Sequence, residues 1–595
     1  FNLMDTMPRL VGATYMSPLR ATGVAMPDET IDQYRAQRIA KRDALTKLGV
    51  NPYAVRTPAR DAISSIKAEF EKLEAASPKP AEGKHDGPKV AGKAVAGRVL
   101  ANRKMGKAVF LDVFDETGKV QVYLNAKSVG DAAMAVYEQI DLGDFIYVKG
   151  DIQRTRTGEV TLFATELKFL TKALAVPPLP RTYKDESGKE ITHDAFTDTE
   201  LRYRKRYLDL MVHADVRARF EQRSQVLAAM RDYLGKKNYL EVETPMLHAI
   251  PGGARARPFI THHNTLHMNM YLRIAPELYL KRLLVGGFER VFEINRNFRN
   301  EGIDATHNPE FTMMELYEAY GDYNSMMEIT EGLIRHAANT IRPDGNLIFK
   351  WGEVDVDLGK PFARRKYSDL LREYAGVELH DVAAVAAKAK ALGLEVHEDH
   401  YKLADQVLEA TAMSHLIQPT FMIDYPTAIC PLTKAREDDP KLCERFELFI
   451  NGVEFANAFS ELNEPMEQLA RFKEQVEMGA KSADVEAPKE IDYDYVEALE
   501  AGMPPAGGLG LGIDRLIMLL TNTHSIRDVL LFPHMKRDHS HGSGGATQRA
   551  ELAVETLIEE ISSPELRKLG KEVAPIIGRL EGLVAEFRVA QGTKK

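Results

Sequence analysis

Apolar and polar residues alternate along two neighbouring stretches near the middle of the chain, residues 292–298 and 311–319. A period of two is typical of β-strands, because successive side chains point to opposite faces of a sheet. The segment between them holds Gly302 and Pro309, which favour turns, so the pattern predicts two antiparallel strands joined by a polar loop. Glu315 shares the apolar face of the second strand, where a buried carboxylate is costly unless a positive group meets it.

A second region of short apolar stretches lies between residues 94 and 170, with glycines at the breaks. This spacing predicts short strands separated by tight turns, with one helix near residues 132–139. Five strands in about eighty residues are typical of the OB-fold, a small β-barrel. The predicted strands cover residues 95–100, 109–114, 120–124, 145–149 and 160–169.

Helices and linkers are predicted on either side of this barrel. The residue pattern predicts helices over 28–48, 60–76 and 216–236. Residues 77–93 are poor in large apolar side chains, and residues 171–196 contain several prolines, so both stretches are predicted linkers.

Composition narrows the class of protein. At 595 residues the chain has room for two or three domains, and its charged fraction of 28% is ordinary for a globular protein. A formal net charge of −9 argues against a uniformly basic nucleic-acid binder but allows one basic face. Residues 35–60 hold seven Lys or Arg and one acid, Asp43. These basic residues are interpreted either as a solvated helix face or as a contact with a tRNA backbone.

The two cysteines, Cys430 and Cys443, are too few for a disulfide framework or a Cys-rich zinc site, which fits a reducing compartment. Charged residues interrupt the apolar runs, so no membrane-spanning segment is predicted. We predict a cytoplasmic location. Arg9 and Arg20, with Asp5 as the single acid of the first residues, leave a mitochondrial presequence as the alternative.

The sequence FEINRNFRNEGIDATHNPEFTMMELYEAYGD at residues 292–322 resembles motif 2 of the class II aminoacyl-tRNA synthetases, in particular the lysyl type. The stretch YLEVETPML at 239–247 resembles motif 1, and GGLGLGIDRL at 507–516 resembles motif 3. The segment TDTELRYRKRYLDL at 197–210 matches the start of the lysyl-type catalytic domain. The resemblance implies an α+β fold, in which an antiparallel-sheet catalytic domain follows an N-terminal OB-fold barrel, with helical extensions.

The same resemblance implies an activity. ATP would activate L-lysine to lysyl-adenylate plus pyrophosphate, and lysyl would then pass to the 3′ end of tRNA(Lys), with diadenosine tetraphosphate as a side product. It also implies a homodimer that uses magnesium and no zinc. The predicted domains are an N-terminal helical extension and linker (1–93), an OB-fold anticodon-binding domain (94–170), a linker (171–196), a class II catalytic domain (197–540) and a C-terminal helical extension (541–595), with helices at 549–561 and 564–589.

The resemblance assigns ATP to the predicted hairpin and to motif 3. Arg299 suits a bidentate grip on the α-phosphate, Phe311 would stack on adenine, and Arg515 would cover the other adenine face. Arg299, Glu301 and Arg515 are the predicted catalytic residues. The predicted ATP-binding set is Arg299, Asn300, Glu301, His307, Asn308, Phe311, Glu454, Phe455, Gly512 and Arg515.

Glu447 and Glu454 are the predicted magnesium ligands. Both have apolar neighbours, and a turn at Asn451 and Gly452 would bring them together across a hairpin. Converging carboxylates repel each other unless a cation neutralises them, and hard oxygen ligands favour magnesium. A pair of surface acids is the alternative.

Specificity for lysine rests on the charge of the predicted amino-acid pocket. The resemblance assigns the substrate to side chains that are acidic or neutral, which suits a ligand with an α-ammonium and an ε-ammonium group. We therefore expect no basic side chain in this pocket. The predicted lysine-binding residues are Gly253, Glu277, Glu315, Tyr317, Asn457, Phe459 and Glu461.

Two other functions are weighed against this one. An aspartyl- or asparaginyl-type synthetase shares the architecture, but an aspartate pocket needs a cation for the side-chain carboxylate. A catalytically retired tRNA-binding paralogue would have lost parts of the nucleotide site. The residues that argue against this loss are Arg299, Glu301, Glu454 and Arg515, all of which are present.

In the predicted barrel, the resemblance assigns anticodon contacts to Arg98, Phe110, Gln121 and Glu166. Unpaired bases are read by aromatic stacking and by hydrogen bonds to their edges, and these side chains can supply both. Taken without the resemblance, Phe110 would be interpreted as barrel core.

Overall fold

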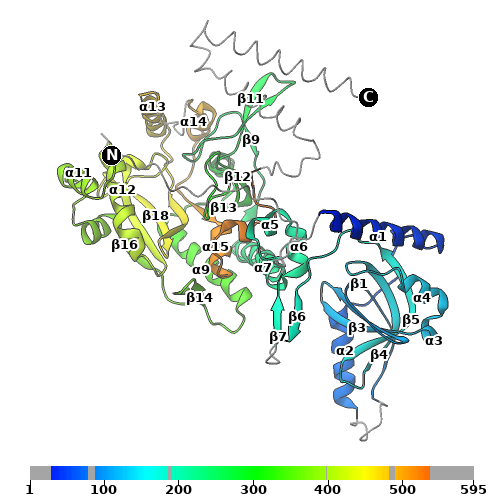
Figure 1. The fold of residues 1–595 in the computed structure, drawn as a ribbon. Coiled ribbons are helices and arrows are strands. Elements are labelled where there is room, and N and C mark those ends of the chain that lie inside the picture. The colour runs from blue at the N-terminus through cyan, green and yellow to red at the C-terminus, as the bar shows by residue number, and fades with distance from the viewer. Residues whose placement is uncertain are drawn as a thin grey trace, which may run out of the picture. The chain divides into compact units, whose positions relative to one another are not determined.

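The computed structural model of the chain describes residues 28–77, 87–184, 190–194, 196–396, 399–481 and 490–536, and its elements are labelled in Figure 1. The helices predicted at 549–561 and 564–589 lie outside the described residues, as do Arg9 and Arg20. Among the helices that are described, none is long and apolar enough to cross a membrane.

The first compact part is a closed five-stranded barrel, as the spacing of apolar stretches predicted. Its strand order is β1-β2-β3-β5-β4, and β3 runs parallel to β5 while the other pairs are antiparallel. The strands are β1 (Val90–Met105), β2 (Ala108–Asp115), β3 (Gly118–Leu124), β4 (Phe145–Arg154) and β5 (Val160–Thr171), with α3 (Ala126–Val129) and α4 (Asp131–Tyr137) between β3 and β4.

Two glycines allow the barrel to close. A Cβ atom at Gly97 would lie 2.2 Å from the carbonyl oxygen of Phe114, and one at Gly150 would lie 2.1 Å from that of Phe163. Neither position leaves room for a side chain, because the opposing atoms are backbone. Two helices precede the barrel, α1 (Asp28–Lys47) and α2 (Ile63–Ala76), and the apolar face of α2 belongs to the barrel core.

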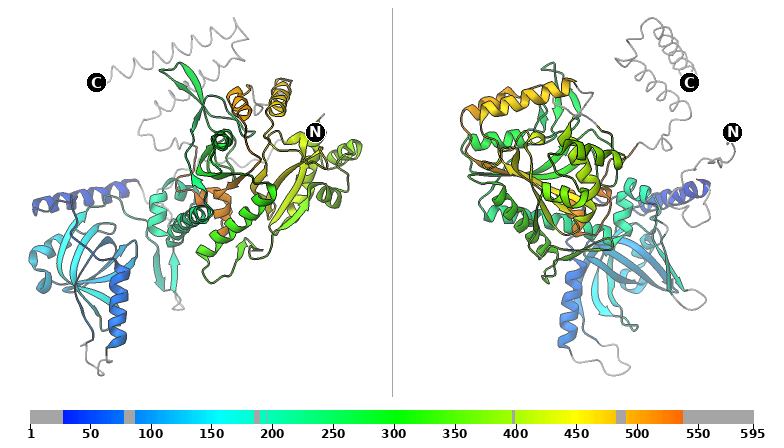
Figure 2. Two further views of the ribbon diagram at one scale, coloured as in Figure 1. Left: turned by 180° about the vertical axis from the view of Figure 1, so that it is seen from behind. Right: turned by 90° about the vertical axis from the view of Figure 1, so that its left-hand side faces the viewer.

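The second part is built on an eight-stranded sheet with the order β16-β17-β18-β19-β20-β13-β12-β8. Figure 1 labels its strands β12, β13, β16 and β18, and Figure 2 shows the same part of the chain from two further sides. Its interior pairs are antiparallel, and only the two edge pairs, β16 with β17 and β8 with β12, are parallel. The predicted hairpin is present as two of these strands. The sheet contains β8 (Leu240–Glu241), β12 (Arg290–Phe298), β13 (Glu310–Ala319), β16 (Ala363–Lys366), β17 (Thr420–Pro426), β18 (Leu442–Ile450), β19 (Val453–Ser460) and β20 (Ala506–Gly512).

Alternate residues of β13 separate the two faces of the sheet. Met314 and Leu316 join the main core with the helices α7 (Ala214–Lys236), α9 (Tyr323–Ile341) and α15 (Ile513–Leu520), which cover one face. Tyr317 joins a smaller core with α8 (Glu277–Val285) and α14 (Tyr493–Glu500) on the other face. Glu315 has the same parity as Tyr317, so it points to the α8 side. Most of the apolar core lies on one face of the sheet, so the α8 face has room for polar side chains beside its smaller core.

Smaller elements surround this sheet. Two lie within the predicted linker 171–196, where β6 and β7 pair as a short antiparallel hairpin. The remaining elements are β6 (Arg181–Lys184), β7 (Glu190–His193), α5 (Thr199–Arg204), α6 (Arg206–Val212), β9 (Leu247–His248), β10 (Ile260–His263), β11 (Met268–Leu272), β14 (Ile348–Trp351), β15 (Val354–Asp357), α10 (Tyr367–Leu370), α11 (Val382–Ala391), α12 (His400–Ala412), α13 (Pro465–Lys481) and α16 (Ile526–Val529).

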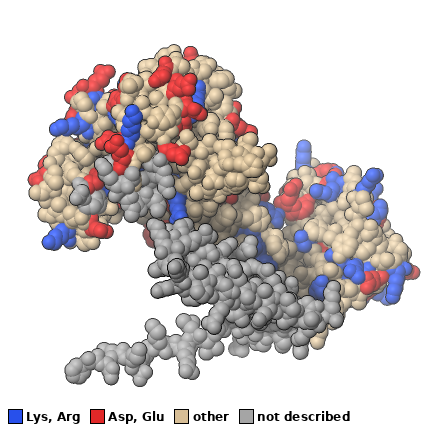
Figure 3. All heavy atoms as spheres, turned by 90° about the horizontal axis from the view of Figure 1, so that it is seen from above, with Lys and Arg blue, Asp and Glu red and all other residues tan. Residues whose placement is uncertain are grey.

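Charge on the surface is mixed. On the face shown in Figure 3, Lys and Arg side chains are interspersed with Asp and Glu side chains, in line with the modest net charge. Some basic residues of the run 35–60 are used internally. Arg38 is buried and donates to the carbonyl oxygens of Ala173 and Leu142, and Lys41 pairs with Asp141 at 2.6 Å.

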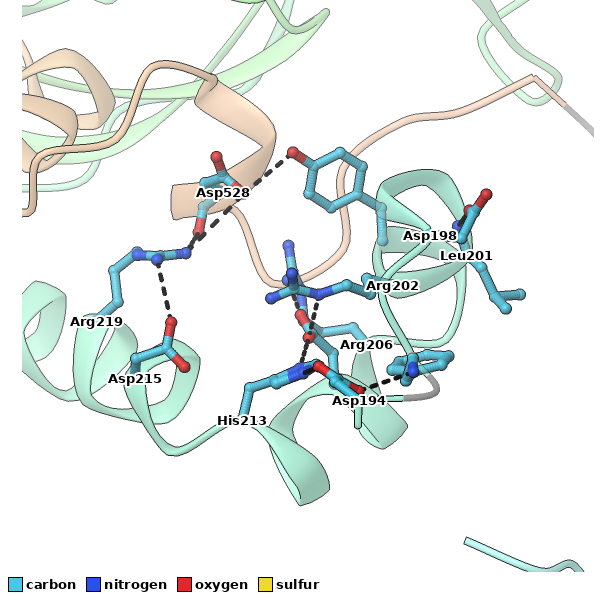
Figure 4. Close-up of polar contacts among 12 residues, drawn as sticks. Asp194, Asp198, Leu201, Arg202, Arg206, His213, Asp215, Arg219 and Asp528 are labelled. Carbon is cyan, nitrogen blue, oxygen red and sulfur yellow. Dashed lines mark hydrogen bonds and ion pairs between the residues drawn. The ribbon is translucent and has the colours of Figure 1, made fainter. Parts of the chain in front are cut away.

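A buried carboxylate, Asp209, fastens the first helices of the second part, and its partners Arg202, Arg206 and His213 are labelled in Figure 4. Arg202 Nε donates to its Oδ1 at 2.7 Å, Arg206 Nη1 donates to its Oδ2 at 2.5 Å, and His213 Nδ1 lies 2.6 Å from Oδ1. Burial would raise the pKa of Asp209, but the hydrogen bonds from Arg202 and His213 hold it below its usual value. Arg206 also donates to backbone carbonyls at 527, 530 and 531, which ties α6 to the segment after α16.

Asp209→Asn is therefore expected to destabilise the protein strongly. It removes the counter-charge shared by two arginines and leaves buried cations unpaired, which costs roughly 3–5 kcal/mol. Urea unfolding measures the loss. Asp215→Asn is the matched control, because Asp215 is exposed and lies 3.8 Å from its partner Arg219. Equal loss in the two variants would contradict the structural role of Asp209.

Candidate active site

Glycines on β20 form the floor beneath a buried group of polar side chains on the α8 side of the sheet. Gly508 lies opposite Tyr317, and Gly510 lies opposite Glu315. A Cβ atom at Gly508 would lie 1.9 Å from Glu461 Oε1 and 2.5 Å from the ring of Tyr317. The absence of side chains on this strand therefore creates the space into which its neighbours point their polar groups.

A cavity continues from this floor toward the loop between β12 and β13. Within it, the Arg299 guanidinium lies 5.1 Å from the centre of the Phe311 ring, and the Arg299 Nε has no hydrogen-bond partner within the described parts of the chain. A free guanidinium edge beside an aromatic plate suits an anionic ligand that also carries a flat ring. The predicted residues that line this cavity are Arg299, Glu301, His307, Asn308, Phe311, Glu454, Phe455, Asn457, Gly512 and Arg515.

Arg515 enters the same cavity from the first turn of α15. Its Nη1 donates to the carbonyl oxygen of Glu454 at 2.7 Å and lies 3.4 Å from the Glu454 carboxylate, while its Nη2 lies 3.5 Å from His307 Nε2. The neighbouring Asp514 anchors the helix, because it accepts from the backbone N–H of Thr312 at 2.8 Å and pairs with Arg223 at 2.7 Å. Arg515 is thus held across the cavity from the hairpin strands.

The predicted hairpin between Glu447 and Glu454 is present. Asn451 and Gly452 have φ values of 49° and 73°, the left-handed values that a two-residue hairpin turn requires. A bulge shifts the register, so Glu447 lies opposite Asn457 and Glu454 lies opposite Phe449. The two carboxylates are therefore not cross-strand partners.

Glu447 is largely enclosed by polar partners, with 17% of its side chain exposed. Tyr425 donates its hydroxyl to Oε2 at 2.7 Å, and Arg445 pairs with Oε1. Burial raises the pKa of Glu447 to about 7, against the pull of Arg445, and the charge of Glu454 raises it further. Even with Arg445 beside it, the positive charge near this carboxylate does not offset the effect of burial on its pKa.

A divalent cation fits this deficit. Glu454 lines the cavity, and Glu447 interacts with it electrostatically from the neighbouring strand. No group of three or more His, Cys, Asp or Glu side chains suited to a metal occurs in the described ranges. Magnesium, which retains waters and takes further oxygen ligands from phosphates, needs only one or two protein carboxylates.

Three acids from three elements are buried together above the glycine floor, at a place we call the pocket, and none of the three lines the cavity. Glu277 comes from the first turn of α8, Glu315 from β13, and Glu461 from the residue after β19, and none is more than 6% exposed. Tyr317 donates its hydroxyl to Glu315 Oε2 at 3.2 Å. Burial, and then the charge of Glu277, raise the pKa of Glu315 to about 8. Such a pocket is short of positive charge and favours cations.

The expectation that no basic side chain enters this pocket is wrong. Lys281 lies within it, fully buried, and its Nζ donates to Glu277 Oε1 at 2.6 Å and pairs with Glu461 Oε2. Its ammonium also lies 5.4 Å from the centre of the Phe459 ring. The sequence did hold a signal for this residue: Lys281 follows Glu277 by four positions, the spacing that places two side chains on one helix face.

The other predicted pocket residues are close to these acids. Gly253 has a φ of 83°, and a Cβ atom there would lie 3.1 Å from Glu277 Cβ, so its backbone packs directly on this glutamate. Asn457 lines the cavity and accepts from Arg445 Nε at 3.1 Å. Asn300 is the one predicted ATP-binding residue that does not line the cavity.

In the barrel, the structure brings Phe110 and Gln121 to one surface. The Phe110 and Tyr123 ring centres are 5.2 Å apart, as are those of Tyr123 and Phe163, so three strands present a row of aromatic rings. Gln121 accepts from Thr161 at 2.9 Å beside this row. Sequence reasoning did not include Tyr123 or Phe163, although both alternate with buried residues along their strands.

The other two predicted barrel residues do not join this row. Arg98 packs over the Phe145 ring at 4.2 Å and donates to the Gly143 carbonyl oxygen. The arginine opposite Phe110 is Arg103, which donates to Asp112 Oδ1 at 2.8 Å. Glu166 lies further along β5 and pairs with Lys168 at 2.8 Å.

Two family models match the chain. Residues 198–536 match the model described as tRNA synthetases class II (D, K and N), and residues 94–170 match the model described as OB-fold nucleic acid binding domain. The first match spans the part of the chain that holds the eight-stranded sheet, and the second spans the barrel.

Curated relatives are similar over most of the chain. The lysine–tRNA ligase of Pelotomaculum thermopropionicum is 49% identical over 449 residues, which is 74% of this chain and 86% of that protein. That of Carboxydothermus hydrogenoformans is 45% identical over 516 residues, 86% of this chain and 99% of that protein. That of Clostridium tetani is 43% identical over 525 residues, with 86% and 98% covered.

The raised pKa of Glu315 predicts a pH-dependent stability. The unfolded carboxyl ionises near its usual pKa of 4.5, whereas the folded one holds its proton up to about pH 8, so the stability of the ligand-free protein falls as the pH rises between these values. Glu315→Gln removes this loss. We expect the difference in melting temperature, variant minus wild type, to increase from pH 5.5 to pH 8.5. Glu310→Gln, at the partly exposed start of the same strand, is the control, and a gain independent of pH would contradict the assignment.

Proposed function

The chain belongs to the class II tRNA synthetases, the family of the D, K and N enzymes, and we propose that it acts as a lysine–tRNA ligase. It activates L-lysine with ATP and transfers lysyl to the 3′ end of tRNA(Lys). The observation that carries the choice of amino acid is the buried pocket of three carboxylates beside a cavity with two arginines. The relatives whose names specify lysine support the same choice.

Activation needs positioning more than acid–base chemistry. The lysine carboxylate is already ionised at neutral pH, so no general base is required for its attack on the α-phosphate. Arg299 offers a free guanidinium edge to that phosphate, and Phe311 offers a face to the adenine. Arg515 closes the opposite side, where its contact with Glu454 fixes its direction. Glu301, His307 and Asn308 border the nucleotide.

Glu447 and Glu454 would hold magnesium. When bound, the ion offsets the charge of the phosphates and of the leaving pyrophosphate. The support is the carboxylate pair itself, because the high pKa of Glu447 reflects a local shortage of positive charge. The chain's own part is to keep Glu447 oriented through Tyr425 and Arg445.

The pocket charge separates lysine from aspartate and asparagine. The pocket sets three acids against a single cation, Lys281, so a ligand that brings further ammonium groups meets acids without a cation of their own. Lysine brings two ammonium groups, whereas aspartate would bring a second carboxylate into an acidic site. A buried charge left without its partner costs roughly 1–3 kcal/mol or more, which penalises ligands that lack the distal amine.

The barrel supports an anticodon-binding role. Phe110, Tyr123 and Phe163 form a row on which unpaired bases can stack, and Gln121 and Arg103 offer hydrogen bonds beside it. The exposed basic residues of the N-terminal part are candidates for backbone contacts. These are Arg35, Lys47, Arg56 and Arg60.

A homodimer is the proposed assembly. The motif 1 segment presents Leu240, Met246 and Leu247 at 47%, 37% and 43% exposure, and β8 is an edge strand. Apolar side chains along an unpaired edge favour contact with a second copy of the chain.

Pyrophosphate exchange with a panel of amino acids tests the proposed function. We expect the purified protein to exchange pyrophosphate into ATP with lysine and not with aspartate or asparagine. No exchange with any of the three would support the retired paralogue, and exchange with aspartate or asparagine would support the alternative specificity.

Gly508→Ala tests the glycine floor in the same assay. The new Cβ would lie 1.9 Å from Glu461 Oε1, so the carboxylate must move, and we expect the KM for lysine to rise by about tenfold or more. Gly286→Ala is the control, because its Cβ would meet nothing closer than 3.4 Å. An unchanged KM in Gly508→Ala would show that Glu461 does not contact the substrate.

Phe110→Ala tests the aromatic row. Loss of one stacked base costs about 1–3 kcal/mol, so we expect the KM for tRNA to rise roughly tenfold in aminoacylation while lysine-dependent pyrophosphate exchange is unchanged. An equal loss in both assays would contradict a separate anticodon-binding role for the barrel.

A further inference from the structure

Lys281 is a buried cation that takes no part in the proposed mechanism. It lies on α8 with no exposed surface, and its ammonium contacts Glu277 from its own helix and Glu461 from the end of β19. The Phe459 ring of β19 and the Tyr495 hydroxyl of α14 face it as well. Burial would lower the pKa of Lys281, but the charges of Glu277 and Glu461 outweigh burial and raise it. Lys281 is therefore protonated.

The two glutamates depend on this ammonium. Burial raises the pKa of both Glu277 and Glu461, and Lys281 opposes the rise in each case. Without a cation between them, two buried carboxylates would take up protons instead of remaining charged. A protonated pocket would then have to release those protons before it could pair with an ammonium group of a ligand.

Lys281 does not satisfy the pocket completely. Neither oxygen of Glu461 accepts a hydrogen bond of good geometry from the described residues, although Oε2 lies in ion-pair contact with Lys281. Oε1 and the Tyr317 ring lie over Gly508, in the space that a side chain on that residue would fill. Glu315 has only the Tyr317 hydroxyl as its hydrogen-bond donor in the described structure. Acceptors for further donors thus remain on two of the three acids.

We infer that Lys281 is a positioning and specificity residue: a fixed internal cation that holds the carboxylates of Glu277 and Glu461 in place and opposes their protonation, so that the ammonium groups of lysine meet acids ready to pair with them. This inference rests on the proposed function and deepens it. The opposite role is that of a competitor, in which Lys281 occupies the place of a substrate ammonium group and must leave when lysine binds.

The two roles predict opposite effects of Lys281→Met, which keeps the length of the side chain and removes its charge. If Lys281 holds the acids ionised, the KM for lysine rises at least tenfold at pH 7 with kcat changed less than threefold, because the carboxylates are protonated in the free variant. If Lys281 competes with substrate, the KM falls.

Proton release gives a readout that a purely structural role would not alter. Isothermal titration of lysine into the protein at pH 7, in buffers of different ionisation enthalpy, counts the protons released on binding. We expect Lys281→Met to release about one proton more per lysine than wild type, and its log KM to fall more steeply with pH by about one unit per pH unit. Lys281→Arg keeps the charge and should retain the wild-type proton count.

Three results would overturn the inference: a lower KM in Lys281→Met, an unchanged proton count in that variant, or an equal increase in Lys281→Arg. Thermal melts check that the variants are folded. If Lys281→Met does not fold, Lys281→Gln, which can still donate to Glu461, carries the same test. Failure of the proposed function is distinguishable, because wild type would then show no lysine-dependent pyrophosphate exchange.

Discussion

Burial of carboxylates without enough positive charge to match them is the constraint on which the active site depends. An ionised carboxylate in an apolar interior is tolerated only if cations or hydrogen-bond donors compensate it. The sheet collects such groups on its α8 face, from α8, β13 and the end of β19, and β20 contributes glycines in place of side chains. The opposite face carries the main hydrophobic core, and packing there offsets the free-energy cost of burying the acids.

Comparison with other buried acids shows why this cluster is different. Asp209 is shared by two arginines and a histidine, and Glu293 pairs with Arg273 at 2.7 Å while Thr244 donates to its second oxygen. In both cases the structure itself supplies the compensation, and the role is structural. Glu315 has no cation of its own, and its pKa stands near 8. A deficit of this kind marks a place where a ligand supplies the missing charge.

Sequence patterns predicted the parts of the fold that local rules govern. Alternation with a period of two located β12 and β13, and short apolar stretches separated by glycines located the barrel strands. Glu315 stood out because it broke the apolar face of its strand. The register shift at the bulge between β18 and β19 was not visible, since nothing local in the sequence marks it. Lys281 was missed because the pocket was assembled from residues of matching charge, although physical compensation requires the opposite sign nearby. Tyr123 and Phe163 were missed because a row of rings forms only when three strands are aligned.

The two halves of the site are linked through one side chain, Arg445. Its Nη2 pairs with Glu447, and its Nε donates to Asn457, which lines the cavity beside the acid pocket. Because the guanidinium is planar and rigid, a shift that improves one contact alters the other. Arg445 is only partly exposed and also donates to Cys430 Sγ at 3.2 Å, so it has little room to adjust without its partners. The position of the carboxylate that would hold the metal is therefore mechanically coupled to the amide that borders the amino-acid pocket.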